Sequence, residues 1–343
     1  MTAAPITPSG QDRAEFARLA DPYRRELIEH CYRMVGSVHD AEDLVQETYL
    51  RAWRGYPGFE GRASLRTWLH RIATRTCLTA IERRRGRALP AGLGGPAEDV
   101  DGPLAELPES TWLEPLPDAL GGWRAGGVGR RSGVDSSDPA VVVADRAGLR
   151  LALVAALQHL PPRQRAVLLL RDVLAWRAAE VADLLNTSTA AVNSALQRAR
   201  AQLAAAAPAE DRVVEPDDPQ QRALLDRYAE AFEQADTVAL TRLLTADATW
   251  EMPPYPTWVR GRDAVAALIA AQCPGRPGDT RMVATRANGC PAFAAYQRDT
   301  DGVLRAHGVH VLRLVPGAVA AVVAFLDPGL FPAFDLAPVL YED

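Results

Sequence analysis

Residues 178–197 read AAEVADLLNTSTAAVNSALQ, and this stretch decides the fold of the region around it. Its first helix ends at Asn186, one of the few residues other than glycine that tolerate the left-handed conformation after a helix. Ser188 can then cap a second helix. That second helix carries an apolar stripe at helical spacing, made of Val192, Leu196, Ala199 and Leu203. The pattern therefore predicts a helix-turn-helix.

The opposite face of the second helix is polar and carries side chains that suit DNA. Its residues are Thr189, Asn193, Ser194, Gln197, Arg198 and Arg200. Asn, Gln and Arg make bidentate hydrogen bonds to base edges in the major groove. We expect this face to bind DNA together with Arg163 and Arg165, which precede the motif in the segment LPPRQR (160–165). A plain helical hairpin with a polar outer face is the alternative.

The charge of the 343-residue chain is unevenly spread, although its net value is −5. Residues 1–90 hold 15 Arg and 11 acidic residues, and residues 146–207 hold 8 Arg and 3 acidic residues, which gives +4 and +5. Residues 91–145 and 208–343 each carry −7. The two basic blocks can bind a polyanion in spite of the overall charge. Domains that simply differ in surface charge are the alternative.

A second motif, DAEDLVQETYLRAW, covers residues 40–53 and is predicted to be helical. Ser37 stands three residues before Asp40, as a helix N-cap does. One face of this helix is acidic, with Leu44 and Gln46 beside it; the acidic residues are Asp40, Asp43 and Glu47. Such a stripe suits a basic partner surface. A solvated acidic face is the alternative.

A third motif, FEGRASLRTWLHRIA, covers residues 59–73 and opens a helix predicted from about Ser64 to Arg85. It combines a Gly-flanked loop with cationic side chains and an aromatic ring, which is typical of surfaces that bind single-stranded nucleic acid. The candidate contacts are Phe59, Arg62, Ser64, Arg66, Arg71 and Arg75. The Arg-rich run RRRGR (83–87) is expected to contact phosphates without reading sequence.

Two acidic linkers are predicted, over residues 91–140 and 208–220, because both are rich in Gly or Pro and lack periodicity. An apolar patch, WLEPLPD (112–118), interrupts the first one. After residue 221 two helices, 224–233 and 238–244, precede strand-like runs. These runs cover 248–252, 282–286, 292–297, 304–314 and 318–326. Helices followed by an antiparallel meander predict an α+β domain.

The three motifs, in this order, resemble the extracytoplasmic-function group of the bacterial sigma-70 family. Residues 160–203 resemble the group's DNA-binding domain that reads the −35 promoter element. Residues 40–53 resemble the helix that docks on RNA polymerase, and 59–73 resemble the segment that reads the −10 element. The resemblance implies two partners, promoter DNA and the RNA polymerase core, the latter bound through the clamp helices of its largest subunit.

The tail resembles a SnoaL-like, cone-shaped α+β domain, on the pieces MPPYPTW (252–258), ANGCPAF (287–293) and FLDP (325–328). Such cones enclose an apolar pocket, and the candidate lining residues are Trp250, Tyr255, Trp258, Tyr296, His310 and Phe325. His310 with Asp327 is the one plausible acid–base pair. No nucleophile, metal or phosphate-binding motif accompanies it, so we expect no catalytic residue, cofactor or metal. Sigma factors with such a tail and a WLEP-like linker patch form a subgroup in which the tail is thought to regulate. We expect the tail to pack on the DNA-binding domains through residues 112–117 and to set their activity.

The sequence is therefore interpreted as a multidomain sigma factor: two all-α domains, the second a helix-turn-helix, followed by an α+β cone. The expected parts are 12–90, the linker 91–140, the helix-turn-helix domain 141–207, the linker 208–220 and the SnoaL-like domain 221–335. Four cysteines without paired spacing and the lack of a long apolar run predict a cytoplasmic protein away from membranes. A one-component ligand-sensing regulator and an enzyme with a DNA-binding appendage remain alternatives. An anti-sigma partner and a small ligand are left open.

Overall fold

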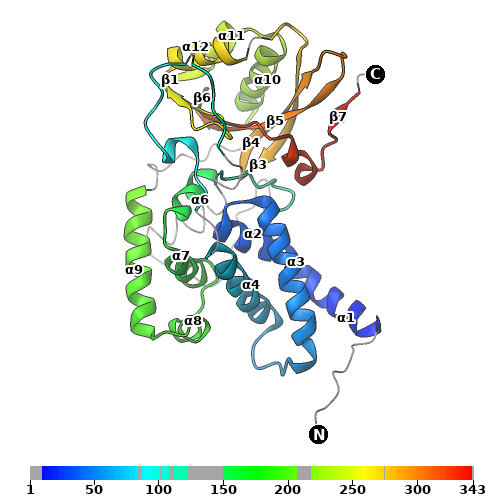
Figure 1. The fold of residues 1–343 in the computed structure, drawn as a ribbon, viewed down its shortest axis with the longest axis vertical. Helices are drawn as coiled ribbons and strands as arrows, with labels where there is room; N and C mark the ends of the chain where they lie inside the picture. The colour runs from blue at the N-terminus through cyan, green and yellow to red at the C-terminus, as the bar shows by residue number, and fades with distance from the viewer. Residues whose placement is uncertain are drawn as a thin grey trace.

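The structure is a computed structural model, and it describes residues 10–82, 86–100, 102–107, 112–121, 150–206, 218–273 and 275–341. Two helical units lie next to each other, and a mixed β-sheet with three helices lies above them (Figure 1). Parts of the Arg-rich run, of the predicted linkers and of the ends of the predicted helix-turn-helix domain fall outside the described residues, namely 83–85, 101, 108–111, 122–149 and 207–217.

Among the described residues, the first helical unit contains four α-helices, and the sequence predicts where the last two begin. Its helices are α1 (Gly10–Ala20), α2 (Arg24–Val35), α3 (Val38–Gly55) and α4 (Leu65–Ile81). Ser37 caps α3 by accepting a hydrogen bond from the backbone N–H of Asp40 at 3.0 Å, and Ser64 caps α4 by accepting one from Thr67 at 3.1 Å. The α4 helix ends at Ile81, before the predicted end at Arg85.

The second helical unit contains the predicted helix-turn-helix. Its elements are α6 (Leu151–Gln158), α7 (Pro162–Leu168), the π-helix η5 (Leu169–Val173), α8 (Ala178–Leu185) and α9 (Thr189–Ala206). Asn186 follows α8 in the left-handed conformation, with φ 50° and ψ 57°, and Ser188 accepts a hydrogen bond from the N–H of Ala191 at 3.1 Å. The apolar stripe of α9 is buried against α6, α7 and α8. The predicted turn and caps are therefore confirmed.

The tail forms a mixed sheet in the order β2-β1-β6-β5-β4-β3, and the short β7 pairs with β5. Its helices are α10 (Pro219–Glu233), α11 (Thr237–Arg242) and α12 (Arg262–Gln272). Its strands are β1 (Leu244–Glu251), β2 (Trp258–Arg260), β3 (Thr280–Ala287), β4 (Cys290–Arg298), β5 (Leu304–Val315), β6 (Ala318–Phe325) and β7 (Val339–Leu340). A 3-10 helix, η6 (Pro328–Phe334), follows β6.

Two features of the predicted tail are wrong. The sheet is not purely antiparallel, because β1 lies beside β6 and runs parallel to it. The second predicted helix does not reach Leu244, since that residue already pairs with Val319 of β6 as the start of β1. Such pairing joins residues far apart in the chain, and local periodicity carries no signal for it.

The alternation of side chains along the strands divides the apolar residues of the tail between two cores. One face of the sheet, with Trp250 and Phe293, packs under α10 and forms a core of its own with Tyr228. The other face, with Val311 and Phe325, belongs to the same core as the two helical units. The tail and the helical units therefore share one apolar core.

The described part of the first linker is bound to the tail along its length. The Trp258 indole N–H donates to the Gly94 carbonyl at 2.9 Å, and the Gln272 side chain donates to the Val100 carbonyl at 2.9 Å. Farther along, Leu113 and Leu116 of the WLEPLPD patch are buried in the shared core. The expectation of a linker without packing contacts is therefore wrong for residues 94–100. The packing expected through residues 112–117 is found, because apolar side chains gain from burial.

Gly36, which follows α2, lies where the first linker and both helical units meet. It adopts a φ of +73°, and a Cβ added there would lie 2.7 Å from Leu113 Cδ1 and 3.0 Å from the Gln158 side-chain carbon. Gly61 has a similar φ of +69°, but nothing lies within 4 Å of the position of its missing Cβ. Comparing an alanine substitution at Gly36 with one at Gly61 therefore separates the free-energy cost of backbone strain from that of a steric clash.

We predict that Gly36→Ala lowers the free energy of unfolding by more than Gly61→Ala, with an excess of about 1–3 kcal/mol, because only Gly36 combines strain with a clash. Urea denaturation followed by tryptophan fluorescence measures both variants. Equal losses at the two positions would show that the junction at Gly36 is loose.

Candidate nucleic-acid and partner interface

The polar face of α9 is open to solvent, as the sequence predicts. Its exposed residues are Thr189, Asn193, Ser194, Gln197 and Arg198, and Arg163 is exposed in the first turn of α7. The Arg198 guanidinium donates to the Ser194 hydroxyl at 2.7 Å, which holds both side chains on the outer surface. The arrangement can offer amide and guanidinium groups to base edges in a groove.

Two arginines predicted to bind DNA have other partners. Arg165 is 2% exposed and donates to the carbonyls of Gln158 and Leu160 at 3.0 and 3.1 Å, and also to that of Met34. Burial lowers the pKa of Arg165 to about 10. Arg200 forms a two-pronged ion pair with Asp172, at 2.9 and 2.8 Å. The prediction for Arg165 is wrong in this conformation, because a side chain at this depth has no surface to present to DNA.

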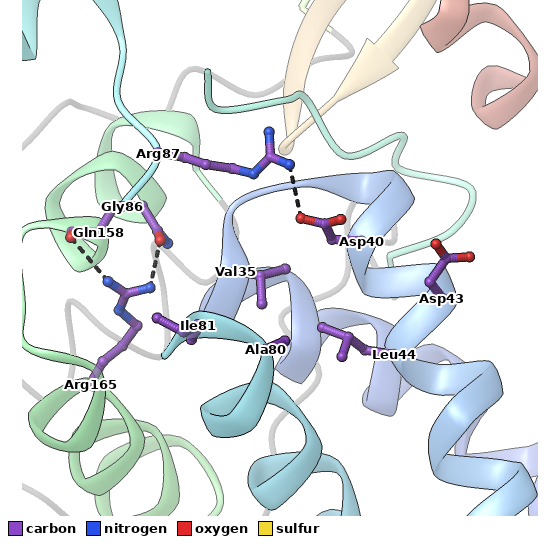
Figure 2. Close-up of a pocket in the computed structure, with 10 residues that line it drawn as sticks. All are labelled: Val35, Asp40, Asp43, Leu44, Ala80, Ile81, Gly86, Arg87, Gln158 and Arg165. Carbon is purple, nitrogen blue, oxygen red and sulfur yellow. Dashed lines mark hydrogen bonds and ion pairs between the residues drawn. The ribbon is translucent and has the colours of Figure 1, made fainter. Parts of the chain in front are cut away.

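Some residues on the acidic face of α3 are exposed to solvent, and others form ion pairs within the chain. Asp43 and Gln46 are exposed, Leu44 is half-buried, and Glu47 pairs with Arg51 at 2.6 Å within the helix. Asp40 differs, because its carboxylate lies 2.8 Å from the Arg87 guanidinium. Figure 2 shows this pair at the rim of a cleft of about 110 Å³.

Glu114 of the WLEPLPD patch gathers hydrogen bonds from the start of α3. The Ser37 hydroxyl donates to its carboxylate at 2.7 Å, and His39 Nδ1 lies 3.0 Å from the same oxygen. Arg87 approaches the other oxygen at 3.3 Å. Burial opposes the charge, but the bond from His39 and the charge of Arg87 outweigh it and lower the pKa of Glu114. The bond to Glu114 raises the pKa of His39 to about 9 in turn.

The segment at the start of α4 holds most of its predicted contacts near the surface. Phe59 packs on Trp68 in a tilted arrangement with ring centres 4.8 Å apart, and the Arg66 guanidinium donates to the Glu26 carboxylate at 2.9 Å. Arg62 and Arg75 are exposed, Arg71 is half-buried, and Ser64 serves as the N-cap. Arg87, expected to contact phosphates, is buried against Asp40 and Glu114 instead.

Comparisons with known proteins find a match for each of the three parts. Family models match Sigma-70 region 2 over residues 19–87, Sigma-70 region 4 over 150–203 and a SnoaL-like domain over 225–322. "ECF RNA polymerase sigma factor SigG" of Mycobacterium tuberculosis is 55% identical over 96% of this chain and 86% of its own length. The chain belongs to the ECF RNA polymerase sigma factors.

A second relative of this sigma factor has a solved structure. SigJ of Mycobacterium tuberculosis is 30% identical over 72% of this chain and 69% of its own length. The crystal structure of SigJ matches with a TM-score of 0.56 at 25% identity and covers 95% of this chain and 100% of that one. The helical sigma domains followed by a SnoaL-like domain are thus a shared architecture.

The predicted pocket of the sigma factor's tail is not one site. Trp250 and His310 pack together under α10, with ring centres 5.9 Å apart. Tyr296 and Phe325 lie in the shared core on the opposite face of the sheet. Tyr255 and Trp258 bond to the linker, through Glu106 and Gly94 respectively. The prediction that these residues line one pocket is wrong, because alternate strand positions point to opposite faces.

The predicted acid–base pair of the tail is also wrong. His310 is 5% exposed, and its Nδ1 lies 3.1 Å from the Tyr228 hydroxyl. Burial, with a smaller effect from His307, lowers the pKa of His310 to about 3. Asp327 instead accepts a hydrogen bond from the N–H of Gly329 at 2.8 Å as the cap of η6. Within the described ranges, no cluster of three or more His, Cys, Asp or Glu side chains could hold a metal ion.

Packing of the tail through residues 112–117 is expected from the sequence, but sequence reasoning missed the polar contacts by which the sigma factor's first helical unit meets the tail. The Asn288 amide donates to the Tyr32 hydroxyl at 3.0 Å and accepts from the N–H of Leu116 at 2.9 Å. Asp118 accepts from Arg286 at 3.0 Å and from the N–H of Gly289 at 2.7 Å. The apolar patch inside an acidic linker was the signal for this junction, whereas nothing in the local sequence pointed to Asn288 or Tyr32. In the described part of the chain, no helix is long and apolar enough to cross a bilayer.

We predict that His39 titrates near pH 9 in the folded chain and that Glu114→Gln returns its pKa towards 6.5. Because the folded pKa lies above the unfolded one, the stabilisation from this contact is complete below pH 6.5 and is lost as the pH rises through 9. NMR titration of the imidazole measures the shift. Glu42→Gln, which removes another carboxylate from α3, should leave it unchanged.

Proposed function

We propose that the chain binds RNA polymerase core through the acidic face of α3 and directs it to promoters through α9 and the start of α4. The observation that carries this proposal is the exposed polar face of α9, with Asn193, Gln197 and Arg198 aligned on one side of the second helix of a helix-turn-helix. In such motifs this helix lies in the major groove, and these side-chain types read base edges there. Such a factor acts in the cytoplasm, where the polymerase is.

The packing of the two helical units supports a change of arrangement on the promoter. The α7 helix packs on α2 and α4, and Arg165 reaches across to the Met34 carbonyl. The −35 and −10 elements are separated along the DNA by about 3.4 Å per base pair. We expect the two units to part when both elements are bound, and Arg165 then loses its contact with the Met34 carbonyl.

We further propose that the tail regulates these units and catalyses nothing. His310 is too deeply buried to exchange protons with a substrate, and Asp327 is occupied as a cap. The described contacts of the tail are directed at the linker and the first helical unit. A ligand-sensing regulator that never meets the polymerase is less favoured, because it would have no use for the open stripe of Asp43, Gln46 and Glu47.

Run-off transcription with RNA polymerase core tests the proposal on the full chain. We expect Asp43→Arg to abolish the promoter-specific transcript, because a cation then faces the basic surface of the polymerase. Asp226→Arg makes the same charge change on an exposed site of α10 and should leave the transcript intact. A transcript that survives Asp43→Arg would contradict docking through α3.

Promoter binding by α9 is tested separately. We expect Gln197→Ala to weaken binding of promoter DNA by the polymerase holoenzyme by about 5–150-fold, as the loss of a bidentate base contact worth about 1–3 kcal/mol does. Because Gln197 is exposed, the melting temperature should not change. Gel-shift titration at fixed salt measures the affinity, and Gln220→Ala at an exposed position of α10 is the control. Unchanged affinity for Gln197→Ala would exclude this residue as a base contact.

A further inference from the structure

One carboxylate on the acidic face of α3 already has a cation from the same chain. Asp40 Oδ2 lies 2.8 Å from Arg87 Nη2, and the two side chains are only 20% and 9% exposed. By contrast, Glu47 pairs with Arg51 at the surface, where both side chains are at least 40% exposed. The Asp40–Arg87 pair is therefore sheltered from water, and such pairs are screened less than surface ones.

Arg87 is held from a second side by the WLEPLPD patch. Its Nη1 donates to the Trp112 carbonyl at 2.7 Å and approaches Glu114 Oε1 at 3.3 Å. The Arg87 guanidinium thus bridges α3 and the linker. Its planar, rigid set of N–H donors is well suited to binding two acceptors at once. Figure 2 shows the Arg87 side chain extending over the first turn of α3 towards Asp40.

The same contacts continue from the linker into the tail. Glu114 bonds to His39 Nδ1 at 3.0 Å, and His39 Nε2 lies 3.2 Å from the carbonyl of Gly329 in η6. A continuous polar chain therefore runs from Asp40 through Arg87, Glu114 and His39 to Gly329. Any movement of η6 away from α3 removes one end of this chain.

We propose that Arg87 is an internal competitor of RNA polymerase for Asp40, held in place by the linker and the tail. This inference rests on the proposed docking through α3. A basic side chain of the polymerase and the Arg87 guanidinium require the same sheltered carboxylate, so one must leave before the other binds. Asp43 and Gln46 stay exposed, so the competition weakens docking without preventing it. The tail then regulates docking by holding Arg87.

The test is the affinity of the full chain for RNA polymerase core, measured by biolayer interferometry. We expect Arg87→Gln to bind about tenfold more tightly than the unaltered chain, which is the size of effect that one charged hydrogen bond supplies. The gain should disappear in an Asp40→Asn background, because Arg87 and the polymerase then have no carboxylate at this position to compete for. Equal or weaker binding of a folded Arg87→Gln variant would overturn the proposal.

Two further variants keep the test decisive. Arg87→Lys keeps the buried charge but cannot bridge two acceptors with a planar fork, so its affinity should lie between those of the unaltered chain and Arg87→Gln. If Arg87→Gln does not fold by circular dichroism, Arg87→Lys alone decides: tighter binding supports the proposal and equal or weaker binding overturns it. Arg281→Gln removes a positive charge from a surface ion pair of the tail, 3.1 Å from Glu233, and should change the affinity by no more than about twofold.

The unaltered chain and Asp43→Arg separate this inference from the proposed function. If the unaltered chain binds the polymerase and Asp43→Arg weakens binding, docking through α3 holds, and the Arg87 variants alone judge the competition. If the unaltered chain does not bind the polymerase at all, the proposed function itself fails.

Discussion

The last turn of α2 is the constraint on which the arrangement of the molecule depends. A helix end leaves its final carbonyls without partners inside the helix, and burial makes unmet carbonyls costly. Here the Arg33 and Met34 carbonyls accept from Gln158 and Arg165 of the second helical unit, and the Gly36 carbonyl accepts from the Glu114 N–H of the linker at 3.0 Å. One helix end is thus completed by two other parts of the chain.

This constraint explains why the linker and the tail cannot be treated as additions to a two-domain factor. Leu113 and Leu116 fill the space beside the α2 end, and the sheet face that carries Phe325 continues the same apolar core. Asn288 and Tyr32 add a buried polar contact at this junction, which demands a particular register where apolar packing alone would tolerate sliding. Loss of the tail would therefore expose a wide apolar surface on the helical units.

Helix starts and turns could be predicted from the sequence. Of the contacts between distant segments, only the packing through residues 112–117 could be. Periodicity and capping located the turn at Asn186 and the helix start after Ser37, because both depend on neighbours within a few residues. The burial of Arg165 and the ion pairs of Arg87 with Asp40 and Glu114 depend on segments far apart in the chain. The candidate pocket failed for the same reason: Trp250 and Phe325 are both apolar, and only strand register decides which face each occupies.

The contact between His39 and Gly329 joins residues 290 positions apart in the chain. At about 5–20 residues per second, a ribosome needs on the order of 15–60 s to add that much chain after His39 has been made. During this interval the nascent α3 exists without η6 beside it. Synthesis of η6 is therefore the event that first covers the start of α3, and a protease that removes η6 returns this helix start to its earlier, uncovered state.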